Sequence, residues 1–239
     1  AGSGLGQQFA LTLAEAGASV ALAARRQEKL GETAALIEEA GGKAICTDLD
    51  VTDPLMVTSC VREVQSELGT PDILVNNAGI ARQAFLTDIS EEDWDAVLDT
   101  NLKGVFLMAQ ATAKAMIMAE KPGSIINIAS ILGFGVSKAL GSYIAAKSGV
   151  VQLTKAMALE WTRNGIRVNA LAPGYFVTEI NEAAFEQGAH EMVKKHVPMA
   201  RVGVMGEISG PLLLLASDAG SYMTGSIITV DGGHLIKSL

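Results

Sequence analysis

Residues 1–24 have the sequence AGSGLGQQFALTLAEAGASVALAA. Glycines at positions 2, 4 and 6 lead directly into a helical segment, and a continuous apolar run follows at Ser19–Ala24. Glycines let a backbone turn sharply and approach a pyrophosphate, which would then lie at the positive end of the helix. The spacing differs from a complete G-x-G-x-x-G motif, so the loop alone also fits an ordinary turn.

This order of helix and strand continues along the whole chain. Strands are predicted at Ser19–Ala24, Lys43–Thr47, Ile73–Asn76, Ser124–Ala129, Ile166–Ala172 and Ser226–Val230. Helices are predicted at Leu5–Ala16, Glu28–Ala40, Pro54–Leu68, Glu91–Ala119, Gly141–Arg163 and Gly206–Ala216. The strands are continuous apolar runs, which is typical of a sheet covered on both faces. The sequence therefore predicts an α/β fold: a doubly wound, Rossmann-like parallel sheet in a single domain over residues 1–239.

The glycine loop of such a fold follows its first strand, yet this sequence begins inside the loop. That strand is central in a doubly wound sheet, and its absence would expose two sheet edges. We therefore expect a strand upstream of Ala1.

The composition argues against several classes of protein. Of the 239 residues, 49% are hydrophobic and 18% are charged, which favours a large core over disorder. The net charge of −8 argues against binding to nucleic acid or to an anionic membrane. Cys46 and Cys60 form no CxxC pair, and no charged signal-peptide region opens the sequence, so we expect a cytoplasmic protein with free thiols. His190, His196 and His234 have no partners at ligand spacing, so we expect no metal site.

A candidate acid–base group lies in the predicted helix Gly141–Arg163. Tyr143 and Lys147 are spaced i, i+4 and therefore project from one helix face. An ammonium beside a phenol stabilises the phenolate, so we expect a lowered pKa for Tyr143. Ser130 follows the strand Ser124–Ala129 and lies at the carboxyl edge of the sheet, where doubly wound folds bind their ligands.

The end of the strand Ser19–Ala24 indicates the cofactor. Dinucleotide folds place an acidic residue here for a ribose 2′-hydroxyl, or a basic one for a 2′-phosphate. Ala24 is small and neutral and Arg25 follows it, which favours NADP(H). The alternative is a solvated pair of arginines, Arg25 and Arg26, at the start of a helix.

Together, Tyr143-Ile-Ala-Ala-Lys147, Ser130 and Asn76-Asn77-Ala78-Gly79 resemble the short-chain dehydrogenase/reductase family in its shorter form. The resemblance covers essentially the whole chain. It implies that Tyr143 exchanges the proton at the substrate oxygen and that Ser130 orients this oxygen. It also implies that Lys147 binds the nicotinamide ribose and that Asn101 holds a water beside Lys147. The catalytic residues would thus be Asn101, Ser130, Tyr143 and Lys147.

The resemblance also implies the cofactor-binding residues. They are Ser3, Gly4, Leu5, Gly6, Arg25, Asp50, Val51, Asn77, Ala78, Gly79, Tyr143, Lys147, Pro173, Gly174, Phe176 and Thr178. The Asp50 carboxylate would contact the adenine amine, and the turn from Pro173 to Thr178 would hold the nicotinamide carboxamide. The chain departs from the family at Phe176, where a smaller aliphatic residue is usual. It departs again at Ser3, where NADP-preferring relatives often carry a basic residue.

The substrate is expected to be a small carbonyl compound or secondary alcohol, with hydride transfer to or from NADP(H). Three segments would form its pocket, Ile80–Phe85, Ile131–Leu140 and Tyr175–His196, and their apolar residues favour a neutral substrate. Arg82 leaves a sugar or sugar-acid (gluconate-type) dehydrogenase open, and a 3-oxoacyl thioester reductase is a further alternative. A catalytically idle dinucleotide-binding scaffold is the non-enzymatic alternative, against which the intact catalytic set argues.

The resemblance implies a homotetramer or a dimer that pairs through the two long helices. Small and apolar residues occupy more than one face of these helices: Met108, Ala111, Ala115, Val151, Ala158 and Trp161. We expect neither nucleic acid nor membrane as a partner.

Overall fold

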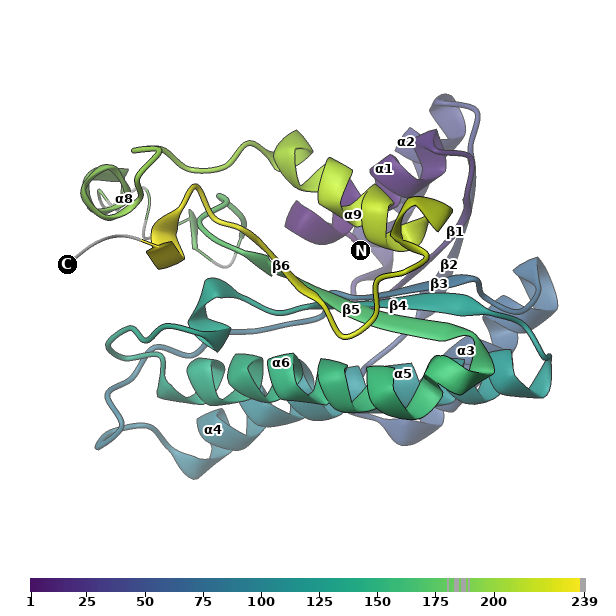
Figure 1. Ribbon diagram of the computed structural model, residues 1–239, viewed down its shortest axis with the longest axis horizontal. Helices are drawn as coiled ribbons and strands as arrows, with labels where there is room; N and C mark the ends of the chain where they lie inside the picture. Colours follow the sequence, from purple (N-terminus) through teal and green to yellow (C-terminus); the bar gives the residue numbers. More distant parts are fainter. Residues whose placement is uncertain (180, 183–184, 186–187, 189, 237–239) are drawn as a thin grey trace.

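The structure is a computed structural model that describes residues 1–179, 181–182, 185, 188 and 190–236. Parallel strands form a central layer with helices on both sides (Figure 1). The described strands are β1 (Ser19–Ala24), β2 (Lys43–Asp48), β3 (Ile73–Asn76), β4 (Gly123–Ile128), β5 (Ile166–Pro173) and β6 (Ile227–Val230). The described α-helices are α1 (Gly4–Glu15), α2 (Gln27–Glu39), α3 (Pro54–Leu68), α4 (Glu91–Leu98), α5 (Gly104–Met118), α6 (Gly141–Trp161), α8 (His190–His196) and α9 (Ser209–Ala216).

The strands are parallel throughout, as the continuous apolar runs predict. They form a pair, β1–β2, and a four-stranded sheet in the order β3–β4–β5–β6. Ile125, Ile126 and Val168, in β4 and β5, have no exposed surface, so these strands are covered on both faces. All carboxyl ends therefore meet at one edge.

The two helix layers bury separate cores. Figure 1 shows α1, α2 and α9 on one face and α3, α4, α5 and α6 on the other. Phe9 of α1 packs with Leu212 and Leu215 of α9 against β4, which explains the aliphatic run at 212–215. Among the described residues, no helix is both long and apolar enough to cross a membrane.

The predicted elements are confirmed with some corrections. The predicted helix Glu91–Ala119 is wrong as one element, because a π-helical segment, Asp99–Lys103, separates α4 from α5. Gly206–Ala216 is helical in the α form only from Ser209, after a 3₁₀ turn. Helix α8, within the segment assigned to the substrate pocket, was not predicted. Cys46 and Cys60 are free, as predicted.

The apolar helix faces that suggested subunit pairing need a correction. Met108, Ala115, Val151 and Ala158 are at most 7% exposed and are buried within this chain. They fill the space under the sheet, since the wide apolar faces of α5 and α6 pack against strands and neighbouring helices. The large apolar side chains that α5 and α6 do expose are Phe106, Ile117, Met118 and Leu159.

Candidate active site and dinucleotide cleft

One cavity of about 840 Å³ lies at the carboxyl edge of the strands. Its lining includes every predicted cofactor-binding residue, from Ser3 to Thr178, together with Ser130. The cavity also runs between β1 and β3, which are edge strands of separate sheets among the described residues. Because all these strands run the same way, residues far apart in the sequence reach one site.

The glycine loop fits close against its neighbours. Gly4 has a φ of +53°, a conformation that L side chains rarely adopt. A Cβ on Gly6 would lie 2.7 Å from Asn77 Nδ2, and a Cβ on Gly4 would lie 3.3 Å from the Thr178 side chain. Ser3 is the N-cap of α1 but makes no side-chain capping bond, so the first N–H groups of α1 are available to an anion. These features fit a pyrophosphate.

Ser130, Tyr143 and Lys147 meet at the inner end of this cavity. Ser130 lies two residues after the end of β4, and its Oγ accepts a hydrogen bond from Leu132 N at 3.1 Å, which leaves the hydroxyl proton to donate. Tyr143 and Lys147 lie on one face of α6, with Lys147 Nζ 5.6 Å from the centroid of the Tyr143 ring. The structure thus brings the predicted acid–base residues together.

Burial controls the protonation of both α6 residues. The Lys147 side chain is 3% exposed and donates to Ile128 O at 2.7 Å. Burial lowers its pKa from 10.5 to about 8. Burial also raises the pKa of Tyr143, although a hydrogen bond with Ser130 acts in the opposite direction. The prediction of a lowered Tyr143 pKa is therefore wrong for this structure, because desolvation of the phenolate outweighs its stabilisation.

Asn101 lies in the π-helical segment and has no exposed surface. Its Oδ1 accepts from Ile80 N and its Nδ2 donates to Ile80 O, both at 2.8 Å. A Cβ on Gly79 would lie 3.4 Å from Asn101 Oδ1 and 3.8 Å from Lys147 Nζ, so the two side chains flank the same point. Asn101 is thus behind the cavity lining and close to Lys147, and it fixes the segment that follows β3.

The cavity carries matched charges near the end of β1. Arg25 Nη1 lies 3.6 Å from Asp50 Oδ2. Asp50 also accepts from the Thr52 backbone at 2.9 Å and the Thr52 hydroxyl at 2.7 Å. The Thr52 backbone bond is the main cause of a lowered pKa for Asp50, with Arg25 a smaller one, so this carboxylate stays charged.

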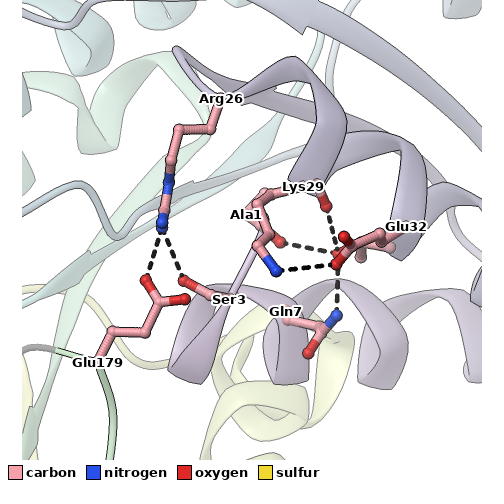
Figure 2. A network of polar contacts seen from close by, with 8 residues as sticks. Ala1, Ser3, Gln7, Arg26, Lys29, Glu32 and Glu179 are labelled. Carbon is pink, nitrogen blue, oxygen red and sulfur yellow. Dashed lines mark hydrogen bonds and ion pairs between the residues drawn. The ribbon is translucent and has the colours of Figure 1, made fainter. Parts of the chain in front are cut away.

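Arg26 is a candidate site residue that the sequence interpretation left out. Its Nη2 donates to Glu179 Oε2 at 2.7 Å and to Ser3 Oγ at 3.1 Å (Figure 2). These contacts join the glycine loop to the segment after β5. The basic pair Arg25–Arg26 was the available signal, but the partner of Arg26 is 153 positions away.

A buried polar chain beneath the site was also missed. Asn76 Nδ2 donates to Asn127 Oδ1, and Asn127 Nδ2 donates to Thr154 Oγ1, both at 2.9 Å. The chain ties β3 and β4 to α6 and thereby positions the helix that carries Tyr143 and Lys147. Asparagines interrupting the apolar runs ILVN and SIINIA were the signal.

The turn after β5 lines the cavity and packs closely against the chain at the end of β6. Gly174 N donates to Val230 O at 2.9 Å, and a Cβ on Gly174 would lie 2.7 Å from Asp231 Cα. Phe176 is 4% exposed and belongs to the core that contains Phe9 and Leu212. The large ring at position 176 is therefore accommodated by packing into the core, while it still lines the cavity.

A glycine loop at a helix start, facing the carboxyl edge of a doubly wound parallel sheet, defines a dinucleotide-binding α/β protein. A family model described as enoyl-(acyl carrier protein) reductase matches residues 1–234. The 3-oxoacyl-(acyl-carrier-protein) reductase of Thermotoga maritima is 40% identical over 236 residues, covering 99% of this chain and 95% of the relative.

Solved structures are equally similar. A short-chain type dehydrogenase/reductase from Mycobacterium marinum has a TM-score of 0.94 and 42% identity, covering 98% of this chain and 92% of that one. A gluconate 5-dehydrogenase from Burkholderia cenocepacia J2315, in complex with NADP and tartrate, has a TM-score of 0.95 and 39% identity, covering 99% and 93%. The chain belongs to the short-chain dehydrogenase/reductase family of NAD(P)-dependent oxidoreductases.

Proposed function

We propose that this protein transfers a hydride between NADP(H) and a small carbonyl compound or secondary alcohol, with Tyr143 as the general acid or base. The proposal rests on one observation: Ser130, Tyr143 and Lys147 line the same cavity as the glycine loop. One domain would supply both the cofactor site and the substrate site.

The bound nicotinamide would supply or accept the hydride. Tyr143 holds a proton at neutral pH, since the ordinary pKa of a tyrosine is 10.0 and burial raises it further, and Tyr143 would give this proton to the substrate oxygen. Ser130 would donate its hydroxyl proton to the same oxygen and orient it. Lys147, with a pKa of about 8, is mostly protonated at pH 7 and would bind the ribose hydroxyls, with Asn101 behind it. This protonation favours carbonyl reduction near neutral pH.

The preference for NADPH over NADH rests on the end of β1. Ala24 has no carboxylate that would repel a 2′-phosphate. The exposed Arg25 can bind this phosphate through two charge-assisted hydrogen bonds. The relative from Burkholderia cenocepacia binds NADP, which supports this assignment. Asp50 would contact the adenine amine with the oxygen that now faces Arg25.

A sugar-acid substrate is the second candidate. Its support is the 39% identity to a gluconate 5-dehydrogenase, together with Arg82 near the expected substrate pocket. Arg82 Nε donates to Asp93 Oδ1 at 3.0 Å, and Nη1 donates to Ala81 O at 3.2 Å. A substrate carboxylate would have to compete with Asp93. The 3-oxoacyl thioester alternative is supported by the relative from Thermotoga maritima.

Tyr143→Phe tests the proposed function. The variant keeps the ring but has no proton to give, so turnover should fall by at least about a hundredfold. Its dissociation constants for NADPH and NADH should stay within about twofold of the wild type. A panel of ketones, ketoacyl thioesters and gluconate-type polyols, followed by nicotinamide absorbance, would identify the substrate class. If Tyr143→Phe kept most of its activity on the best substrate, Tyr143 would not be the proton donor.

We further propose that the protein works in the cytoplasm as a homotetramer or a dimer. Phe106 and Leu159, exposed on α5 and α6, would then lie in the contact between subunits. Light scattering that gave a mass near 24.9 kDa over a wide concentration range would contradict this assembly.

A further inference from the structure

At the adenosine end of the cavity, basic side chains are paired with carboxylates. Three basic side chains that line it each face a carboxylate: Arg25 faces Asp50 at 3.6 Å, Arg26 faces Glu179 at 2.7 Å, and Lys29 faces Glu32 at 3.2 Å. A cofactor phosphate has a charge near −2, and to bind here it must compete with these carboxylates for the basic side chains.

Glu179 differs from the other two carboxylates in what holds it. Asp50 is fixed by Thr52, and Glu32 lies one turn from Lys29 on the same helix. Glu179 instead reaches across from the segment after β5. Its pKa is lowered chiefly by the hydrogen bond from Arg26 and secondly by Ser3, so it faces them as an anion.

Arg26 is placed to serve two anions in turn. The same nitrogen, Nη2, contacts Glu179 and the Ser3 hydroxyl on the glycine loop. Arg26 directly follows the Ala24–Arg25 end of β1, where the 2′-phosphate is expected. Its side chain is 59% exposed and that of Glu179 is 48% exposed, so neither is locked in place by packing. Arg26 thereby supplies a cation beside Ser3, the loop position that lacks one of its own.

We propose that Glu179 is an internal competitor for the cofactor 2′-phosphate, and that Arg26 exchanges Glu179 for this phosphate when NADP(H) binds. The inference rests on the proposed use of NADP(H). Both side chains are exposed, so their ion pair is weak, and a phosphate with a charge near −2 attracts Arg26 more strongly than a carboxylate with a charge of −1 does. Glu179 lowers the affinity for NADPH and leaves that for NADH unchanged, because NADH has no group that competes for Arg26.

The turn that carries Glu179 is held by contacts of its own. Glu179 is held in a turn in which Thr178 N donates to Asn181 Oδ1 and Asn181 Nδ2 donates to Phe176 O, both at 2.8 Å. The same turn contacts the glycine loop at Gly4 through Thr178. None of these contacts involves the Glu179 carboxylate, so they can persist when Arg26 releases it.

Titrations of purified protein with NADPH, NADH and 2′,5′-ADP test the inference, using nicotinamide fluorescence and calorimetry at low salt. Glu179→Gln should bind NADPH and 2′,5′-ADP about threefold more tightly. Arg26→Ala should bind both about tenfold more weakly. Neither variant should change the affinity for NADH by more than about twofold. Arg163→Ala is the charge-matched control, because Arg163 is exposed in the turn between α6 and the amino end of β5, at the opposite edge of the sheet.

Two results would overturn the inference. If Glu179→Gln bound NADPH as the wild type does or more weakly, Glu179 would not be a competitor. If both variants weakened NADPH and NADH equally, the pair would only brace the glycine loop. Failure of the proposed cofactor is a separate result: wild-type protein that binds NADPH no better than NADH contradicts the preference. Even then, Glu179→Gln should create a preference if the inference holds.

Discussion

Replacing Lys147 with methionine should make the protein more stable at neutral pH while abolishing turnover. The Lys147 side chain is 3% exposed, and burial lowers its pKa from 10.5 to about 8. A shift of this size means that the fold disfavours the ammonium by roughly 3 kcal/mol relative to the unfolded chain. Methionine has a similar volume and no charge to desolvate.

The gain is smaller than this penalty because one hydrogen bond is lost. Lys147 Nζ donates to Ile128 O at 2.7 Å, and removing a donor of this kind costs about 1 kcal/mol. Lys147→Met should therefore raise the free energy of unfolding by about 2 kcal/mol at pH 7. Lys147 would thus lower the stability of the fold while serving the reaction, a combination that is common at functional sites.

The effect must depend on pH in one direction. The folded-state pKa is lowered, so between pH 8 and 10.5 the unfolded chain holds a proton that the folded chain has released. The stability of the wild type should therefore rise with pH across this window, and it should lose this contribution as the pH falls through 8. The advantage of Lys147→Met should shrink accordingly and disappear before pH 10.5, where the charge penalty is gone and only the loss of the hydrogen bond to Ile128 remains.

Urea unfolding followed by circular dichroism at about pH 7 and about pH 9.5 measures both variants in the sensitive range. Taking the difference between variant and wild type removes the titration of groups that both proteins share. Lys155→Met is the matched control, because Lys155 is exposed on the same helix, and it should change stability by less than about 0.5 kcal/mol. A Lys147→Met protein no more stable than the wild type at pH 7 would refute the reasoning, and so would a gain independent of pH.

Three further predictions follow from contacts at the site. Ala24→Asp should reverse the cofactor preference to NADH over NADPH, since a carboxylate at the end of β1 accepts hydrogen bonds from ribose hydroxyls and repels a 2′-phosphate. Dissociation constants for both cofactors measure this preference, and an unchanged preference would contradict the prediction. Asn127→Ala removes one hydrogen bond from Asn76 and one from Thr154, which keep only their bonds to the carbonyl oxygens of Val105 and Val150. The free energy of unfolding should fall by about 1–3 kcal/mol in urea titrations, and a loss below about 0.5 kcal/mol would show that the polar chain is not needed. Gly174→Ala places a Cβ 2.7 Å from the Asp231 backbone and should lower the melting temperature by several degrees. Gly206→Ala is the control, because its Cβ would meet nothing within 4 Å and the melting temperature should not fall. Equal effects of the two substitutions would argue against the close contact between Gly174 and Asp231.

Much of the fold could be predicted because local patterns decide it. β1 and β3 begin and end where the apolar runs SVALAA and ILVN do, and the other strands deviate by one residue at either end. Parallel strands have their carboxyl ends at one edge of the sheet. That the residues following these strands lie close together can therefore be predicted without knowing any side-chain contact. This is why the lining of one cavity could be anticipated from positions as distant as Ser3 and Thr178.

Predictions failed where a local pattern was overridden from a distance. The sequence on both sides of Asn101 is helical in its periodicity, so it was interpreted as one helix. Both polar atoms of the Asn101 side chain bond to the Ile80 backbone, 21 positions away, and the π-helical segment sits where these bonds form. Such segments are frequent at functional sites, but their cause lies in another part of the chain.

Charge at the site was the hardest property to predict, because it depends on burial and on partners that only the folded chain supplies. The spacing of Tyr143 and Lys147 correctly places them on one helix face. It does not show how deeply Tyr143 is buried, and this burial raises the pKa of Tyr143 where a lowered pKa was expected. In the pair Arg25–Arg26, the sequence interpretation assigned phosphate binding to Arg25 and gave Arg26 no role of its own. In the fold, Arg25 faces Asp50 while Arg26 bridges the glycine loop to Glu179, so the arginine that sequence reasoning set aside has the shorter ion pair and the contact with the loop. Both shifts in interpretation follow from the same fact: a sequence specifies which charges exist, whereas their energies are set by what folding places around them.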